Sequence, residues 1–140
     1  MALLFALAAL AQNQGAPVVL ENREVMRIEA AFGPYSAADR ARDVSVRLRG
    51  IVERGETHPV VTTYVPIENA TVITTGGALV MTVLGADAKA AGRPQAQLAE
   101  EYAAAIRDAV NLHHEHHTYW SYLLASAQAL TAWAILLGFV

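Results

Sequence analysis

The pattern of hydrophobic and polar positions divides the chain into three parts. Residues 1–11 and 120–140 are almost continuously apolar, whereas the residues between them mix apolar and polar positions. In that middle part, short runs are rich in β-branched residues, as strands are, and longer runs repeat with the period of a helix. The pattern therefore predicts one folded domain with an apolar segment at each end.

Five short runs bounded by turn residues are predicted to be strands. Glu21-Asn22-Arg23 separates the first two as a hairpin turn, and Gly76-Gly77 separates the last two. Glu68-Asn69 lies between the third run and the fourth. The predicted strands are residues 17–20, 25–31, 60–65, 71–75 and 78–84.

One helix is predicted between the second strand and the third. Ser36 is a good N-cap, Asp39 follows three residues later as an acidic first-turn partner, and the helix ends near Gly55. The charged residues of this segment are expected to form a solvated face: Arg40, Arg42, Asp43, Arg47, Arg49 and Glu53. The apolar face consists of Ala41, Val44, Leu48, Ile51 and Val52.

A longer helix is predicted after the last strand. Asp87 is expected to cap a brief turn that Gly92 closes, and Pro94 suits the first turn of the helix that follows. Its apolar stripe consists of Leu98, Tyr102, Ile106, Ala109 and Val110. Because no breaker follows, this helix is expected to continue into the apolar C-terminal segment. The sequence predicts an α+β domain of order ββ-α-βββ-α over residues 12–112.

Residues 1–11 have the length of a signal-peptide core. They end in Ala9-Leu10-Ala11, and these small residues suit cleavage before Gln12. The alternative is a strand or helix of the protein core. We expect a signal peptide, which places the domain outside the cytoplasm.

Residues 120–140 contain no charged residue and have the length of about 20 apolar residues that a membrane-spanning helix requires. The alternative is a buried helix, but the middle of the chain offers too little surface to cover it on all sides. We therefore expect a transmembrane helix. Because the apolar run continues to Val140, we also expect the chain to be a piece of a longer membrane protein.

Four of the five histidines lie in LHHEHHTYW, residues 112–120. Two histidines one helical turn apart can bind a metal, but a zinc site takes three or four protein ligands. Histidine also changes charge near neutral pH, which leaves a pH sensor as a second alternative. We interpret residues 113–119 as a polar collar where the helix enters the bilayer, next to interfacial aromatic residues. The predicted membrane-interface residues are His113, His114, His116, His117, Tyr119, Trp120 and Tyr122.

Composition narrows the function classes. The net charge of −3 argues against a nucleic-acid partner, and the absence of cysteine rules out disulfides and thiolate chemistry. The sequence shows no pairing of a nucleophile with a base, no phosphate-binding glycine loop and no paired carboxylates. We therefore expect no enzymatic activity and no cofactor.

The arrangement resembles the N-terminal extracytoplasmic domain of certain bacterial members of the small-conductance mechanosensitive channel (MscS) superfamily. The similar segments are residues 18–28, 36–41, 80–88, 98–102 and 105–106. The family tends to carry arginines before its first membrane helix, where this chain has histidines. The resemblance implies a channel gated by bilayer tension, a homo-oligomer assembled through regions that follow this chain, and a place in the bacterial inner membrane.

Two functions follow as hypotheses. The first is the extracytoplasmic domain and first membrane helix of a mechanosensitive channel, with the lipid bilayer as its partner. The second is a single-pass anchored domain that binds a protein or an envelope polymer, which requires an exposed apolar or aromatic patch.

Overall fold

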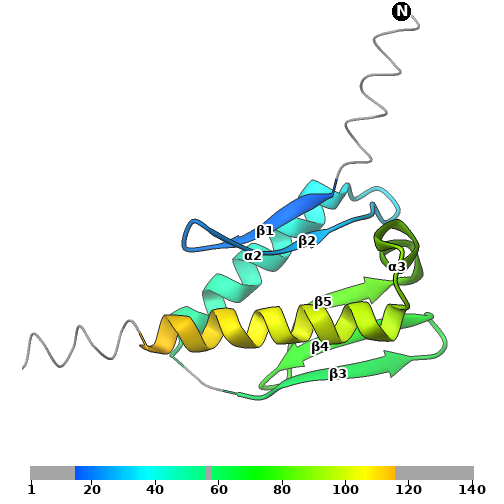
Figure 1. The fold of residues 1–140 in the computed structure, drawn as a ribbon. Helices are drawn as coiled ribbons and strands as arrows, with labels where there is room; N and C mark the ends of the chain where they lie inside the picture. Colours follow the sequence, from blue (N-terminus) through cyan, green and yellow to red (C-terminus); the bar gives the residue numbers. More distant parts are fainter. Residues whose placement is uncertain (1–14, 56–57, 116–140) are drawn as a thin grey trace, which may run out of the picture.

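The structure is a computed structural model that describes residues 15–55 and 58–115. Within these residues the chain forms strands and helices in the order ββ-α-βββ-α-α (Figure 1). The predicted class, a small α+β domain, is confirmed. The predicted signal peptide at residues 1–11 and the predicted transmembrane helix at residues 120–140 lie outside the described residues.

The first two strands, β1 (Ala16–Leu20) and β2 (Arg23–Ile28), form an antiparallel hairpin. The turn contains only Glu21 and Asn22, both with positive φ, as in the tight turns that suit strand twist. The predicted turn was one residue longer, but Arg23 already pairs with Leu20. The prediction that the second strand reaches Ala31 was also wrong. Strand β2 ends at Ile28, which pairs with Ala16, the first residue of β1.

A second sheet contains β3 (Val60–Val65), β4 (Ala70–Thr75) and β5 (Ala78–Leu84) in that order, all antiparallel. The predicted turn at Gly76-Gly77 joins β4 to β5, and both glycines have positive φ. A β-bulge lies where Ile73 and Thr74 face β5, so that the consecutive residues Val80 and Met81 are both buried.

Helix α2 (Ala37–Glu53) begins at the predicted N-cap, Ser36. Ser36 and Asp39 form a reciprocal capping box, in which the hydroxyl oxygen of Ser36 accepts from the Asp39 N–H at 3.1 Å. All five residues of the predicted apolar face are buried, and Ala37 joins them. The local pattern therefore located this helix and its buried side correctly.

The last strand leads directly into helix α3 (Gly85–Ala91), where the sequence predicted only a brief turn. Asp87 is the expected cap, since its carboxylate accepts from the Leu84 N–H at 3.0 Å, and Gly92 ends the helix with a φ of 66°. The long helix then occupies residues 95–115. Of its predicted stripe, Leu98, Tyr102, Ile106 and Val110 are buried and Ala109 is partly buried.

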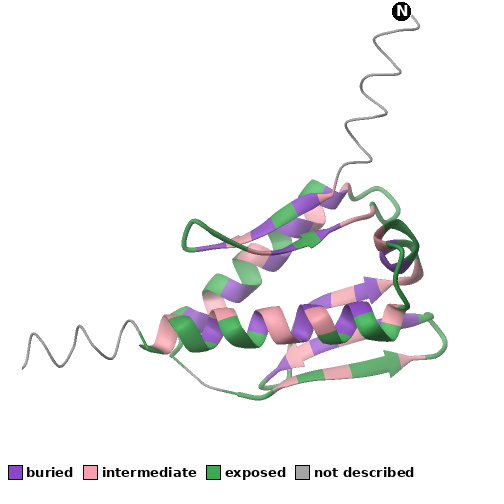
Figure 2. Cartoon of the chain, in the orientation of Figure 1, coloured by how far each residue is buried: buried purple, intermediate pink, exposed green. Residues whose placement is uncertain are grey.

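The long helix crosses the three-stranded sheet, and α2 packs on the β1–β2 hairpin and on β5 (Figure 1). Buried residues from both sheets and all three helices meet in one core (Figure 2). The β1–β2 turn lies at the same end of the domain as residue 115, whereas α3 lies at the opposite end (Figure 1). This arrangement brings Glu21 close to His113, on the last described turn of the long helix.

Candidate functional site

Two of the predicted membrane-interface residues, His113 and His114, fall within the described part of the chain. The other five lie outside it: His116, His117, Tyr119, Trp120 and Tyr122. His113 and His114 are both partly buried on the last described turn of the long helix, and their ring centroids are 6.5 Å apart in an edge-to-face arrangement.

His113 contacts the β1–β2 turn. Its Nδ1 atom lies 2.7 Å from the Oε1 atom of Glu21, and only 12% of its side chain is exposed. Leu20 and Val25 from the hairpin and Ala109 and Leu112 from the helix line the hollow beside this contact. The contact is an ion pair when the imidazole is protonated and a hydrogen bond when it is neutral. His113 therefore links the hairpin to the end of the long helix, a role that the collar interpretation did not include.

Neither a metal site nor a membrane span is found in the part of the chain that the structure describes. Residues 15–55 and 58–115 contain no group of three His, Asp or Glu side chains placed to bind a metal ion. The helices of the same residues do not combine the length and apolarity needed to cross a bilayer.

A second polar centre lies at the opposite end of the domain. The guanidinium of Arg40 in α2 donates to both carboxylate oxygens of Asp87 in α3, at 2.7 and 2.8 Å. It also donates to the carbonyls of Ala30, at 2.5 Å, and Thr82, at 3.1 Å. The Asp87 side chain is completely buried, and that of Arg40 is 13% exposed. The interpretation of Arg40 as part of a solvated face was therefore wrong.

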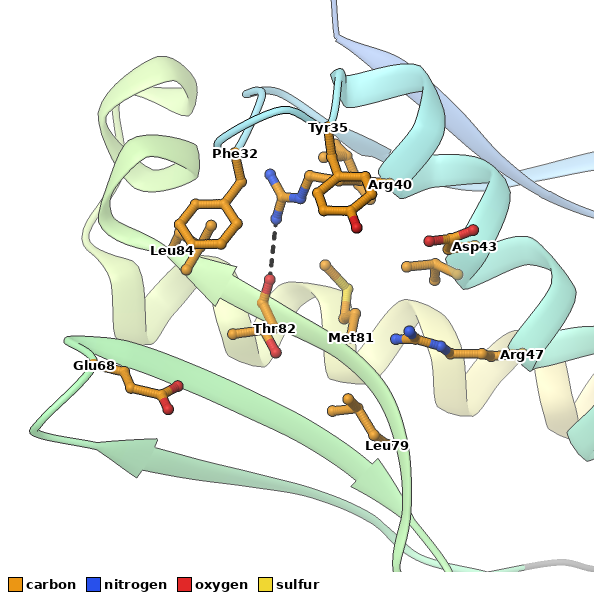
Figure 3. A pocket seen from close by; sticks show the side chains of 12 residues that line it. Phe32, Tyr35, Arg40, Asp43, Arg47, Glu68, Leu79, Met81, Thr82 and Leu84 are labelled. Carbon is orange, nitrogen blue, oxygen red and sulfur yellow. Dashed lines mark hydrogen bonds between the residues drawn. The ribbon is translucent and has the colours of Figure 1, made fainter.

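A cleft of about 630 Å³ opens beside this ion pair (Figure 3). It lies between α2 and β5, and the loop before α2 closes one side with Phe32 and Tyr35. These two aromatic side chains are 57% and 56% exposed, and Leu79 on β5 is 45% exposed. Charged side chains also line the cleft: Arg40, Asp43, Arg47 and Glu68. The cleft is a mostly apolar surface with a few fixed charges, which is suited to binding a ligand or a partner.

The most perturbed titrating group is Tyr102, on the long helix. Burial raises the pKa of its hydroxyl to about 12, and the carboxylates of Asp87 and Glu29 add to this shift. The hydroxyl donates to the carbonyl of Arg27 at 2.5 Å. Tyr102 is thus a protonated hydrogen-bond donor at neutral pH and joins the long helix to β2.

Sequence reasoning did not find Glu21, the Arg40–Asp87 pair or the cleft as features of a site. Glu21 was predicted only as a turn residue, and its partner, His113, lies 92 positions later in the sequence. Arg40 and Asp87 are 47 positions apart, and neither carries a local signal of pairing.

Comparison with curated proteins and with solved structures finds no match. A family profile does match, over residues 17–113, which begin at β1 and end at the histidine that contacts Glu21. Because this match covers well over half of the 140 residues, the chain belongs to the family described as Domain of unknown function (DUF8459).

Proposed function

We propose that this chain is the extracytoplasmic domain and first membrane helix of a channel of the small-conductance mechanosensitive type. The channel is a homo-oligomer in the bacterial inner membrane, assembled mainly through regions that follow this chain. The bilayer is its regulatory ligand, because tension favours the channel state that occupies more membrane area. We assign no enzymatic activity and no cofactor to the domain.

The observation that carries this proposal is the way the domain is built around the long helix. This helix contacts β2 through Tyr102, β3 through Glu100 and the β1–β2 turn through His113. It runs to residue 115, just before the apolar segment that we expect to enter the bilayer. A displacement of that segment would therefore reach both sheets through one rigid element.

A second candidate function is a single-pass anchored domain that binds a protein or an envelope polymer. The cleft with Phe32, Tyr35 and Leu79 favours it, since exposed aromatic and apolar side chains beside fixed charges are typical of binding surfaces. Both candidates place the domain outside the cytoplasm, and they differ in whether the complete protein conducts ions.

The location of the domain can be tested by cysteine labelling, because the chain has no cysteine of its own. Val46 on α2 is 59% exposed, and we expect a Val46→Cys variant to react with a membrane-impermeant maleimide in cells with a permeable outer membrane and an intact inner membrane. Leu48→Cys on the same helix is the control, because Leu48 is fully buried and should react only after denaturation. Labelling of Val46→Cys only after lysis of the inner membrane would place the domain inside.

Channel activity is tested by patch-clamp recording from spheroplasts that make the complete gene product and lack their own tension-gated channels. We expect stepwise currents whose open probability rises with suction. A membrane-inserted complete product that gives no current up to the tension at which the patch ruptures would reject the channel and leave the anchored binding domain.

A further inference from the structure

The outer edges of the two sheets differ in how their backbone groups are satisfied. On the hairpin, the hydroxyl of Ser45 accepts from the Val19 N–H of β1 at 2.9 Å. Pro17 of the same strand has no N–H to offer. On β2, the carbonyl of Arg27 accepts from the Tyr102 hydroxyl. One backbone group on each edge of the hairpin is therefore bonded to a side chain from a helix.

The outer edge of β5 is occupied in the same way. Arg47 donates to the carbonyl of Val80 at 3.3 Å, and Arg40 donates to the carbonyl of Thr82 at 3.1 Å. The Leu84 N–H donates to the Asp87 carboxylate. These three contacts show that Val80, Thr82 and Leu84 turn their backbone groups away from β4.

The outer edge of β3 has no such cover within the described residues. Backbone groups alternate in direction along an antiparallel strand, and the register from β5 through β4 turns those of Val60, Thr62 and Tyr64 away from β4. No side chain of residues 15–55 or 58–115 hydrogen-bonds to these groups. The strand, VVTTYV, also contains no charged residue and no proline, the residues that usually protect an edge. Three of its six residues are exposed and the other three are partly exposed (Figure 2).

We propose that this edge is an interaction surface that pairs, antiparallel, with β3 of a second copy of the chain. An open strand edge requires another strand edge as its partner, and within the described residues every other outer edge of the two sheets has at least one backbone group bonded to a side chain. A second copy offers the same open edge, and pairing of the two β3 strands gives a two-fold symmetric contact.

The register that uses the most outward backbone groups places Thr62 opposite the partner's Thr62. Val60 then faces the partner's Tyr64, a pairing of β-branched and aromatic side chains that stabilises sheets. Each hydrogen-bonded residue pair exchanges two bonds, so about six new backbone hydrogen bonds form across the axis. The two three-stranded sheets become one continuous sheet of both copies.

The contact is weak by itself. A single strand pair buries less than the roughly 1,200 Å² of a stable interface. Glu100, which accepts from the Thr62 hydroxyl at 2.6 Å, also approaches its symmetry mate across the axis, and the two carboxylates repel. Stable pairing therefore depends on a shared membrane, which raises the local concentration of the two copies. In this respect the inference rests on the proposed membrane attachment.

The test uses disulfide formation in the full chain, expressed in bacterial cells and oxidised in isolated envelopes. Paired residues at the axis lie about 5.5 Å apart between Cα atoms, within the range that a disulfide bridges. We expect Thr62→Cys to give a crosslinked dimer. Val61→Cys and Thr63→Cys should each crosslink poorly alone and well when the two variants are co-expressed, because antiparallel pairing places Val61 opposite the partner's Thr63. Val46→Cys, an exposed valine on α2, is the matched control for random collision.

Two further variants are made in the Thr62→Cys background. Tyr64→Pro removes an N–H that points away from β4, so the sheet keeps its internal hydrogen bonds while the crosslink yield falls several-fold. Glu100→Gln removes the repulsion across the axis, so the yield rises. Circular dichroism of the purified proteins reports whether each variant is folded.

The outcomes separate the two proposals. Alkaline extraction of the same envelopes reports membrane attachment, and loss of the protein into the soluble fraction would reject the proposed function. A Thr62→Cys yield no higher than that of Val46→Cys would overturn the pairing, whatever the extraction shows. Equal self-crosslinking at Val61, Thr62 and Thr63 would also overturn it, because that pattern belongs to a parallel or random contact.

Discussion

At the scale of single residues, the domain depends on a few polar side chains that the core surrounds. Asp87 is completely buried, and its charge is balanced by the two-point contact with Arg40. The same carboxylate caps the first turn of α3, and the same guanidinium holds carbonyls of β5 and of the loop before α2. One ion pair thus joins two parts of the chain that are distant in sequence: α2 with the loop before it, and β5 with α3.

Asp87→Ala is expected to reduce the free energy of unfolding by about 3–5 kcal/mol, since it leaves the Arg40 guanidinium buried without its counter-charge. Urea unfolding of the full chain in a mild detergent measures this. Glu24→Ala is the control, because the Arg27–Glu24 pair is half-exposed and such pairs contribute less than about 1 kcal/mol. Equal losses in both variants would show that burial of the Arg40–Asp87 pair has no energetic consequence.

Tyr102→Phe is expected to lower the free energy of unfolding at pH 7 by about 1 kcal/mol, through loss of the hydrogen bond to Arg27. The folded pKa of Tyr102, about 12, is above the ordinary value of 10.0 for tyrosine, so folding favours the neutral hydroxyl. This contribution is fully present below pH 10 and is lost as the pH rises towards 12.

The disadvantage of Tyr102→Phe relative to the unmodified chain should therefore shrink between these two pH values. Unfolding curves from pH 7 to pH 11.5 measure it, and Tyr64→Phe, at a tyrosine that is 55% exposed, controls for removing a hydroxyl. A constant difference across this range would contradict the prediction.

At the scale of elements, the boundaries are set by local chemistry. The Ser36–Asp39 capping box begins α2, and residues with positive φ close the β1–β2 and β4–β5 turns. The bulge in β5 turns two consecutive apolar residues, Val80 and Met81, into the core. Each device acts within a few residues of its position in the sequence.

Ser36→Ala is expected to destabilise the domain by about 1 kcal/mol at neutral pH, as loss of an N-cap usually does. Ser36→Thr keeps the hydroxyl and should stay close to the original stability. Hydrogen bonds from the Ser36 side chain and backbone lower the pKa of Asp39 below the ordinary value of 3.8 for aspartate.

The stabilisation that this shift represents is present above pH 3.8 and is lost as the pH falls through the lowered value. In Ser36→Ala the Asp39 pKa should therefore rise, which an NMR titration of the Asp39 carboxyl would detect. An unchanged pKa would mean that the capping box does not persist in solution.

At the scale of the whole molecule, the long helix connects the two sheets and carries His113 and His114. The contact between His113 and Glu21 holds the β1–β2 turn against the last described turn of that helix. Because the apolar segment follows closely, this contact is the point at which movement of the proposed membrane segment would reach the hairpin.

His113→Gln is expected to speed amide hydrogen exchange in residues 18–25 while leaving exchange in β4 and β5 unchanged, because only the hairpin loses its anchor. Glu21→Gln should have a similar effect, and the double variant should add little to either single change. Glu115→Gln, at an exposed position on the same helical turn, is the control. Unaltered exchange at the hairpin in His113→Gln would show that the turn is held by packing alone.

The sequence by itself determined the five strands, the first helix and the long helix of the described residues and their order, but it predicted α3 only as a brief turn. The signals for these elements are local. They include the N-cap at Ser36, the turn at Gly76-Gly77 and the helical spacing of apolar residues from Leu98 to Val110. The tertiary structure alone decided which polar side chains meet. Arg40 and Asp87 are 47 positions apart in the sequence, and Glu21 and His113 are 92 positions apart. A periodic pattern of apolar residues does not predict contacts over such separations. The open edge of β3 is likewise a tertiary property, because an edge is open only when no distant side chain folds back to cover it.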